Sequence, residues 1–289
     1  MKILVTGATS GMGYGVTKAL AESDLKNELI MMAKSEEEGK KVVSELKDLT
    51  DNSYISYVVC DLSDLKAVDK VITQINHDHN YLDAIFVNAG IGYAKKQIKT
   101  VNHLDPHFQV NYLSQFKLVL GLLDLLKQSQ KGARVIFNAT NYGEINYNDL
   151  QQNNKWSYEK GIYQAMAAKR MFMHKLSRLS LEKDYNVSCC AFHISKTVWT
   201  NQLNIIPKPM KVMATIMKYL GQFISTDQCG QIIAPLFTMS NEDFDSYQNQ
   251  LVSDKNGSFI LLEENDDILD KDNQDRLWQV SLDLLENVK

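Results

Sequence analysis

The chain is poor in cysteine, with four such residues among 289, at Cys60, Cys189, Cys190 and Cys229. Cys189 and Cys190 are neighbours in a segment of strand-like composition, where consecutive side chains point to opposite faces and do not easily bridge. This usage excludes a disulfide-rich secreted domain and is typical of reduced thiols. We therefore expect a cytoplasmic protein.

Long apolar runs and blocks of like charge are also missing. The apolar run at residues 3–5 is interrupted by Thr6 and Gly7, so no signal-peptide core is expected. No stretch approaches the roughly 18 apolar residues of a membrane span, and the amphipathic segment 210–220 has few cations, so we expect no membrane contact. The net charge is −4 without a long basic run, which argues against nucleic-acid partners. We assign no residue to a metal.

Short apolar runs alternate with segments of helical periodicity over the first two thirds of the chain. The predicted strands are residues 2–6, 28–33, 54–60, 82–88, 134–139 and 186–193. The predicted helices are residues 11–23, 35–49, 62–77, 105–129 and 162–185. Such alternation predicts an α/β fold, with a doubly wound parallel sheet between two layers of helices, in one domain over residues 1–289.

The rest of the chain is less regular. Residues 141–160 are expected to be a polar surface excursion, 210–224 a segment that follows a proline-marked loop, 263–275 an acidic solvated loop and 275–288 the last helix. No internal repeat is visible, so a repeat architecture is not expected.

A glycine-rich loop follows the first predicted strand. Residues 6–13 read Thr-Gly-Ala-Thr-Ser-Gly-Met-Gly and open the first predicted helix. Glycines here allow a tight turn and the close approach of backbone N–H groups to a pyrophosphate, and the helix directs its positive end at the same phosphates. The loop lacks the Gly-Lys-Ser/Thr ending of an NTPase phosphate loop. It therefore predicts a dinucleotide site.

Three more motifs follow in order, at residues 60–62 (Cys-Asp-Leu), 88–90 (Asn-Ala-Gly) and 108–111 (Phe-Gln-Val-Asn). With the glycine loop they resemble the short-chain dehydrogenase/reductase family, and residues 226–230 and 277–278 resemble its retinol-dehydrogenase-like branch. The resemblance covers nearly the whole chain and implies a Rossmann-type fold. It implies cofactor contacts from Gly7, Thr9, Ser10, Gly11, Met12, Gly13, Lys34, Ser35, Asp61, Leu62, Asn88, Ala89, Gly90, Lys169 and Thr197.

The end of the second predicted strand bears on the choice of cofactor. An acid there suits the ribose 2′-hydroxyl of NAD, whereas a cation suits the 2′-phosphate of NADP. The sequence has Lys34 and Ser35 and no acid at these two positions, which favours NADP(H) over NAD(H). The alternative is that Lys34 is only a solvated charge.

The family requires a hydroxyl that orients the substrate carbonyl, a tyrosine that passes the proton and a lysine that holds the nicotinamide ribose. By resemblance, Thr140 supplies the hydroxyl, Lys169 is the lysine and Asn111 is the structural and proton-relay asparagine. The tyrosine belongs four residues before Lys169, where the sequence has Ala165. The group that usually does the proton chemistry is therefore missing from its place.

Two other side chains are candidates for the missing proton donor, with a relayed water as a third. Tyr163 lies two residues from the vacant position, which on a helix is a rotation of roughly 200°, so it reaches the site only if the helix begins later. His193 follows the sixth strand, with an ordinary pKa near neutrality. Alternatively, the first is a packing residue and the second a packed or solvated histidine.

The substrate side is expected at residues 195–240, which would form a lid over the site. Residues 210–220 are amphipathic and rich in methionine, which adapts to irregular apolar ligands or partners, or simply packs in a core. We expect an NADP(H)-dependent oxidoreductase of a carbonyl or alcohol group on an apolar or bulky substrate. The alternative is a catalytically degenerate relative that binds NADP(H) as a sensor or partner subunit, and a homo-oligomer or a partner protein is left open.

Overall fold

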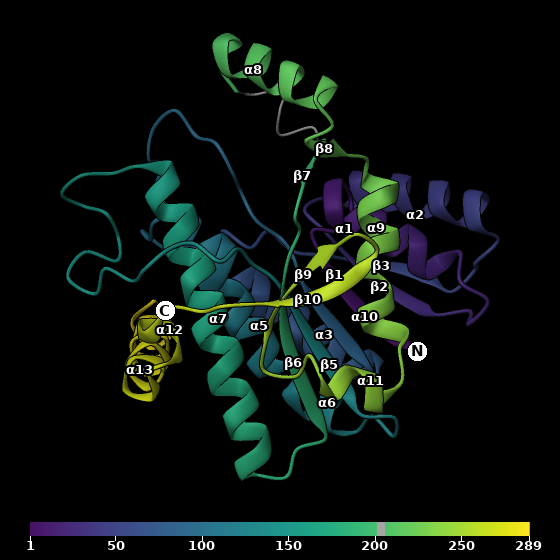
Figure 1. The fold of residues 1–289 in the computed structure, drawn as a ribbon. Coiled ribbons are helices and arrows are strands. Elements are labelled where there is room, and N and C mark those ends of the chain that lie inside the picture. The colour runs from purple at the N-terminus through teal and green to yellow at the C-terminus, as the bar shows by residue number, and fades with distance from the viewer. Residues whose placement is uncertain (201–205, 289) are drawn as a thin grey trace.

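The computed structural model describes residues 1–200 and 206–288. Within them, eight strands form one sheet in the order β10-β9-β6-β5-β4-β1-β2-β3, parallel except for the antiparallel pair β9–β10 (Figure 1). The strands are β1 Lys2–Thr6, β2 Glu28–Ala33, β3 Ile55–Val59, β4 Ala84–Val87, β5 Ala133–Asn138, β6 Val187–His193, β9 Leu251–Lys255 and β10 Ser258–Leu262. A separate parallel pair joins β7 Thr197–Val198 to β8 Phe223–Ile224. The sequence therefore predicts the first six strands correctly.

Helices cover both faces of the sheet, so the chain is a single Rossmann-type α/β domain in three layers (Figure 1). The longer helices are α1 Gly11–Ala21, α2 Glu36–Thr50, α3 Leu65–Asp78, α5 Ser114–Gly121, α7 Tyr158–Glu182, α8 Lys208–Tyr219, α9 Thr226–Ile233 and α13 Lys271–Asn287. The shorter ones are α4 Pro106–Phe108, α6 Leu123–Lys127, α10 Pro235–Thr238, α11 Asn241–Asp245 and α12 Asp266–Leu269.

Two apolar cores lie on opposite faces of the sheet because successive strand side chains alternate. On β1, Leu4 joins the core beneath α3, α5 and α7, whereas Ile3 and Val5 join the core beneath α1 and α2. The same alternation separates Cys189 from Cys190, and the cysteines at all four positions are free and buried. This confirms the expectation of unpaired thiols.

Close packing of α1 on α9 depends on a pair of glycines. A Cβ added at Gly230 would lie 2.0 Å from the carbonyl oxygen of Gly15, and one added at Gly15 would lie 2.0 Å from that of Thr226. Neither position has room for a side chain. The close packing of α1 on α9, beside the glycine-rich loop, therefore requires glycine at both positions.

The region predicted as one helix at residues 105–129 is helical over 106–121 and 123–127, but it is not one regular α-helix. It is divided into α4, a π-helical segment η1 Gln109–Leu113, α5 and α6. Leu122 separates α5 from α6, directly after Gly121. A Cβ on Gly121 would lie 2.6 Å from the Ile72 side chain, and the Gly121 carbonyl accepts a hydrogen bond from Asn76. A glycine whose carbonyl bonds outside the helix weakens helical continuity.

The C-terminal region also differs from the sequence expectation. The helix after the prolines begins at Lys208, with Pro209 in its first turn, and the chain turns at Gly221 (φ +74°) into β8 rather than remaining helical. The expected solvated loop at 263–275 instead contains α12 and a buried Glu264, and the last helix begins at Lys271. Among the described residues, no helix combines the length and apolar character that crossing a bilayer requires.

Candidate functional site

The glycine-rich loop between β1 and α1 is tightly built against the end of β4. Gly7 has φ +63°, and a Cβ on it would lie 2.9 Å from the Cα of Ala89; a Cβ on Gly13 would lie 2.2 Å from the Gly7 carbonyl oxygen. Ser10 precedes α1 in an extended conformation without a side-chain capping bond. The N–H groups of the first turn lack intrahelical partners and can take a phosphate, so the cradle fits a dinucleotide. The other loop residues predicted to contact it, Thr9 and Met12, are half-buried.

The carboxyl ends of β1, β4 and β5 are joined by side-chain hydrogen bonds. The hydroxyl of Thr6 accepts from the backbone N–H groups of Asn88 (2.8 Å) and Ala89 (2.9 Å). The Asn88 amide donates to the Thr6 carbonyl (3.0 Å), and its oxygen accepts from Asn138 (3.2 Å). Asn88 therefore supports the loop. Asn138, which the sequence motifs did not single out, extends this support to β5.

At the end of β2, Lys34 and Ser35 are already engaged. The Lys34 ammonium lies 3.4 Å from a carboxylate oxygen of Asp61 and is 72% exposed, while the Ser35 hydroxyl caps α2 by accepting from the Glu38 N–H. Hydrogen bonds from Ser63 and Lys34 lower the pKa of Asp61 below its usual range, against the effect of burial. Lys34 and Asp61 thus face the same corner, where an adenosine ribose and adenine would lie.

Asn111 lies in the π-helical segment η1, and its side chain is fully bonded to one residue. It accepts from the Ile91 N–H (2.7 Å) and donates to the Ile91 carbonyl (3.0 Å). A Cβ at Gly90 would lie 3.3 Å from the Asn111 oxygen, so the Asn-Ala-Gly segment closes against this amide. The Leu62 carbonyl is tied to the start of α5 by the Ser114 hydroxyl (2.6 Å). The widened helical turn therefore positions the segment after β4.

Lys169 is completely buried on α7 and points toward the ends of β4 and β5. Its ammonium lies 3.2 Å from the carbonyl oxygen of Asn138 and 3.5 Å from that of Val87. Burial lowers the pKa of Lys169 to about 7. A lysine held here can reach a group beside the strand ends, as the sequence predicts for the ribose of a bound dinucleotide.

At the position of the family's tyrosine, this chain has a small side chain that packs in the protein core. Ala165 is fully buried in the core under α7. Tyr163 is 44% exposed, and α7 begins at Tyr158, more than one turn before it. The alternative that Tyr163 lies in a loop entering the helix is therefore wrong, because the Ser157 cap starts the helix earlier.

Thr140 follows β5 closely and His193 is the last residue of the neighbouring strand β6, where Phe192 is paired with Asn138 of β5. Within the described chain, the Thr140 hydroxyl and the His193 Nδ1 are buried without a hydrogen-bond partner. Burial lowers the pKa of His193, and the charge of Arg170 lowers it further, while Asp254 acts in the opposite direction. Two unsatisfied polar atoms thus lie at the carboxyl ends of two neighbouring strands.

Tyr142 connects the two predicted proton donors. Its ring centroid lies 6.2 Å from that of His193 and 6.0 Å from that of Tyr163, both in edge-to-face geometry. Gly143 then turns the chain at φ +105°, with no room for a Cβ beside the Tyr163 carbonyl. The three rings form one aromatic wall at the outer side of the strand ends.

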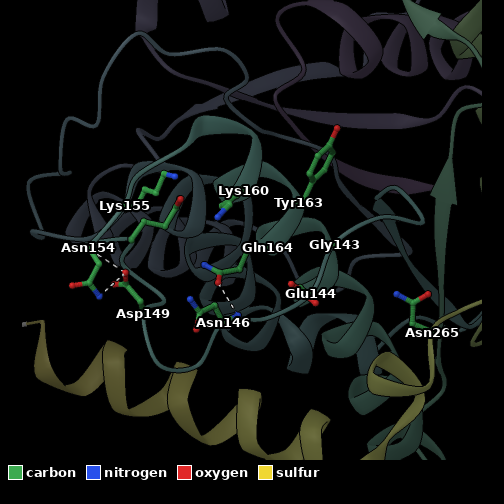
Figure 2. A pocket seen from close by; sticks show the side chains of 11 residues that line it. Gly143, Glu144, Asn146, Asp149, Asn154, Lys155, Lys160, Tyr163, Gln164 and Asn265 are labelled. Carbon is green, nitrogen blue, oxygen red and sulfur yellow. Dashed lines mark hydrogen bonds between the residues drawn. The ribbon is translucent and has the colours of Figure 1, made fainter.

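A hollow of about 620 Å³ lies beside this wall, between α7 and the segment that precedes it. Figure 2 shows the Tyr163 hydroxyl directed away from Asn146 and Gln164, where the Asn146 backbone N–H donates to the Gln164 side-chain oxygen (3.0 Å). The lining of the hollow is polar and comprises Gly143, Glu144, Asn146, Asp149, Gln152, Asn154, Lys155, Lys160, Tyr163, Gln164 and Asn265. The expected surface excursion is therefore the wall of a cavity.

A buried ionic cluster, absent from the sequence predictions, supports the same helix. Arg170 is fully buried, pairs with Glu264 and donates to the Tyr142 carbonyl (3.0 Å). His174 lies 3.3 Å from Glu264 and 2.8 Å from the Asn249 side chain. An arginine within the apolar run of α7 is a signal that an acid must pair with it, because an unpaired buried charge is very costly.

Thr197, predicted to contact the carboxamide, lies on the exposed strand β7, where its N–H donates to the Gln222 carbonyl (3.2 Å). The predicted lid at 195–240 comprises β7, β8, α8, α9 and α10. Its residues 201–205 lie outside the described part of the chain. The lid assignment remains a prediction.

Comparison with known proteins agrees with this architecture. A family model described as short chain dehydrogenase matches residues 1–154. Polyprenol dehydrogenase of Homo sapiens is 32% identical over 182 residues, 61% of this chain, and the chain spans about half (54%) of that protein. Retinol dehydrogenase 11 of Mus musculus is 24% identical over 288 residues, which cover 98% of this chain and 85% of that protein.

Solved structures share the fold at low sequence identity. An NADP active-site complex of Pseudomonas aeruginosa RhlG has a TM-score of 0.66 at 16% identity, covering 87% of this chain and 93% of that one. An uncharacterized protein from Mycobacterium paratuberculosis has a TM-score of 0.70 at 17% identity, covering 99% and 93%. With the family model matching more than half of its length, the chain belongs to the short-chain dehydrogenase family.

Proposed function

We propose that the chain is an NADP(H)-dependent oxidoreductase that interconverts an alcohol and a carbonyl group on a bulky apolar substrate. His193 takes the proton-transfer role that a tyrosine at position 165 would have had. Thr140 orients the reacting oxygen, and Lys169 with Asn111 supports the site from behind.

The observation that carries this proposal is the pair of unsatisfied polar atoms at the ends of β5 and β6. A buried hydroxyl and a buried ring nitrogen without partners, at Thr140 and His193, are costly unless a ligand satisfies them. A substrate oxygen that bonds to both would do so. Tyr163 supports the site less well, because it lies on a helical face turned roughly 200° from the family position.

The cofactor assignment rests on the chain's own residues. The turn of the cradle closes on itself and on Ala89 because Gly7 and Gly13 have no Cβ, and the N–H groups at the start of α1 suit a pyrophosphate. The nicotinamide, when bound, supplies or accepts the hydride. Lys34 is the cation available to a 2′-phosphate, although α2 begins with three glutamates, Glu36, Glu37 and Glu38, which oppose an anion nearby.

The histidine is suited to removing a proton. Because burial lowers the pKa of His193 below its ordinary value of 6.5, the ring is mostly neutral at pH 7 and can accept the proton of an alcohol. The rate of alcohol oxidation should therefore rise with pH through the lowered pKa of His193 and level off near neutrality. Carbonyl reduction needs the protonated ring and rises as the pH falls.

The substrate class is drawn from the relatives and from the lid. Polyprenol and retinol, which appear in the names of two relatives, are isoprenoid alcohols. The predicted lid carries exposed methionines at Met210, Met213 and Met217, which adapt to irregular apolar chains. We therefore propose an isoprenoid alcohol or its aldehyde as the substrate.

A second candidate is a protein that binds NADP(H) without turnover. The observation that favours it is Ala165, which is buried and leaves no hydroxyl at the family's proton-transfer position. Such a protein would act as a sensor of the cofactor or as a partner subunit.

One experiment separates the two candidates. The purified chain is titrated with NADPH by fluorescence and assayed for NADP⁺-dependent oxidation of farnesol and geranylgeraniol. We expect turnover that His193→Gln lowers by about 10²- to 10⁴-fold with NADPH affinity unchanged. The matched variant Tyr163→Phe should retain it. NADPH binding without wild-type turnover, combined with turnover in Ala165→Tyr, would instead establish the second candidate.

A further inference from the structure

Helix α8 stands apart from the body of the protein (Figure 1). Ala214 is its buried residue, and the side chains on either side of it along the helix are exposed. A helix of 12 residues is marginal in water without tertiary packing. α8 therefore needs a surface to pack against.

The exposed side chains of α8 are predominantly apolar. Val212 is 61% exposed, Met213 58%, Ile216 50% and Leu220 71%. Residues three and four apart share a helical face, so Val212, Ile216 and Leu220 form one continuous apolar line. By helical geometry this line faces away from Ala214, the buried residue of the helix.

The remaining side of the helix is basic. Lys208, Lys211 and Lys218 are spaced three and seven residues apart and lie along one edge of the apolar surface. Residues 206–226 contain these three lysines and no aspartate or glutamate, whereas the whole chain has a net charge of −4. Lys218 also lies 4.2 Å from the centre of the Trp199 ring at the base of the helix.

A second segment at the same edge of the sheet has the same character. The loop after β4 leaves the carboxyl edge, as does the chain after β6, and it carries Lys95 and Lys96 in exposed positions. In the same loop Ile98 is 66% exposed and Val101 is 69% exposed. Two separate stretches thus present apolar side chains with nearby lysines in the direction in which the strands end.

We propose that α8 docks this edge of the protein on an anionic lipid surface. The apolar line at Val212, Ile216 and Leu220 enters the boundary between headgroups and acyl chains, and the lysines contact the lipid phosphates and carboxylates. Charge complementarity favours an anionic lipid surface as the occupant. If α8 packed on a neutral cleft of its own chain, the lysines beside the apolar line would not be required. Three lysines and no acid lie in residues 206–226, although acids outnumber cations in the chain as a whole.

Docking of this kind does not depend on turnover. If the proposed function holds, it would also open the substrate site toward the lipid phase, where isoprenoid alcohols reside; this extension rests on the proposed function. Vesicle binding and enzymatic turnover are measured separately, so failure of one is distinguishable from failure of the other.

The test is flotation of the full chain with vesicles of phosphatidylcholine containing 30 mol% phosphatidylserine. We expect binding that weakens at 500 mM NaCl and on pure phosphatidylcholine vesicles. Replacing each lysine of α8 by serine should lower binding about fivefold. Ile216→Glu should lower it at least tenfold, whereas the matched control Leu181→Glu, in the last turn of α7, should bind like the wild type. Both side chains are exposed, 50% and 72%, so neither change disturbs a core.

Three results would overturn the proposal. The first is no flotation with anionic vesicles, and the second is equal loss in Ile216→Glu and Leu181→Glu. The third is unchanged flotation of Ile216→Glu together with impaired turnover of a short water-soluble aldehyde, which would make α8 a lid over the chain's own cleft. Equal thermal melts of the two variants and the wild type confirm that each is folded.

Discussion

Replacing Lys169 by methionine should stabilise the protein without cofactor in a pH-dependent manner. The lysine is fully buried, and burial lowers its pKa from 10.5 to about 7. Methionine has a similar length and no charge. The variant therefore removes the cost of burying an ammonium group and, with it, the cation proposed to hold the cofactor.

The magnitude follows from the two pKa values. Each factor of ten in proton affinity corresponds to about 1.4 kcal/mol, so burying Lys169 costs roughly 4 kcal/mol at pH 7 and roughly 2 kcal/mol at pH 9. Part of this gain is offset in the variant, because the carbonyls of Val87 and Asn138 lose a donor, at about 1–3 kcal/mol. We expect Lys169→Met to be more stable by roughly 1–3 kcal/mol at pH 7 and about equal to the wild type at pH 9.

The direction in which stability changes with pH does not depend on the exact size of the pKa shift of Lys169. Between pH 7 and 10.5 the unfolded chain binds more protons at this residue than the folded chain, so wild-type stability rises with pH in that range. Urea unfolding at pH 7 and pH 9, followed by circular dichroism, measures it. The control Lys183→Met alters an exposed lysine at the end of α7 and should show no such dependence. A difference between Lys169→Met and wild type that stays constant from pH 7 to pH 9 would refute the reasoning.

Three further predictions concern the glycine contacts and the cofactor corner. Gly13→Ala should abolish detectable NADPH quenching and lower stability by about 1–3 kcal/mol, because its Cβ would lie 2.2 Å from the Gly7 carbonyl oxygen; near-normal binding in a titration would contradict this. Gly230→Ala should lower the free energy of unfolding by about 1–3 kcal/mol in urea melts, and an unchanged midpoint would show that α9 can move off Gly15 at little cost. Lys34→Ser should raise the Kd for NADPH about tenfold and that for NADH less than twofold, and equal effects on both would remove Lys34 from 2′-phosphate recognition.

The elements that sequence patterns predict well are those with one dominant periodic signal. The buried parallel strands β1 and β4 are short apolar runs followed by Gly7 or by the Asn88 segment, and both chemistry and position identify them. The dinucleotide loop is equally visible, because glycine adopts the positive φ of Gly7 most readily and the contact at Gly13 leaves no room for a Cβ.

Other features depend on tertiary contacts that no local pattern contains. The π-helical turn at Asn111 exists because its amide closes on the Ile91 backbone, 20 residues away. Glu264 lies in an acidic segment, and such a composition predicts exposure to solvent. The Glu264 side chain is buried instead, where it pairs with the buried Arg170. The β9–β10 hairpin was predictable in principle: Asn256 and Gly257, both at positive φ, are a strong signal for a two-residue turn.

The residues proposed for catalysis come from sequence spacing, and their roles stay predictions. Thr140 follows β5, and Lys169 on α7 directs its ammonium to the carbonyl of Asn138 at the end of the same strand. The sequence could not rank His193 against Tyr163, because the start of α7 decides which way Tyr163 points. The Ser157 cap starts α7 at Tyr158, four residues before the point where the sequence periodicity begins.

The pairing of Arg170 with Glu264 has a consequence for how this chain can be divided. The family model covers residues 1–154, yet the helix that bears Lys169 is neutralised by an acid 94 positions later in the chain. Cutting the chain before Glu264 would leave a guanidinium and His174 enclosed with no counter-charge. The last 26 residues are therefore not an appendage that can be trimmed or exchanged between relatives, and any chimera must transfer α7 and Glu264 together.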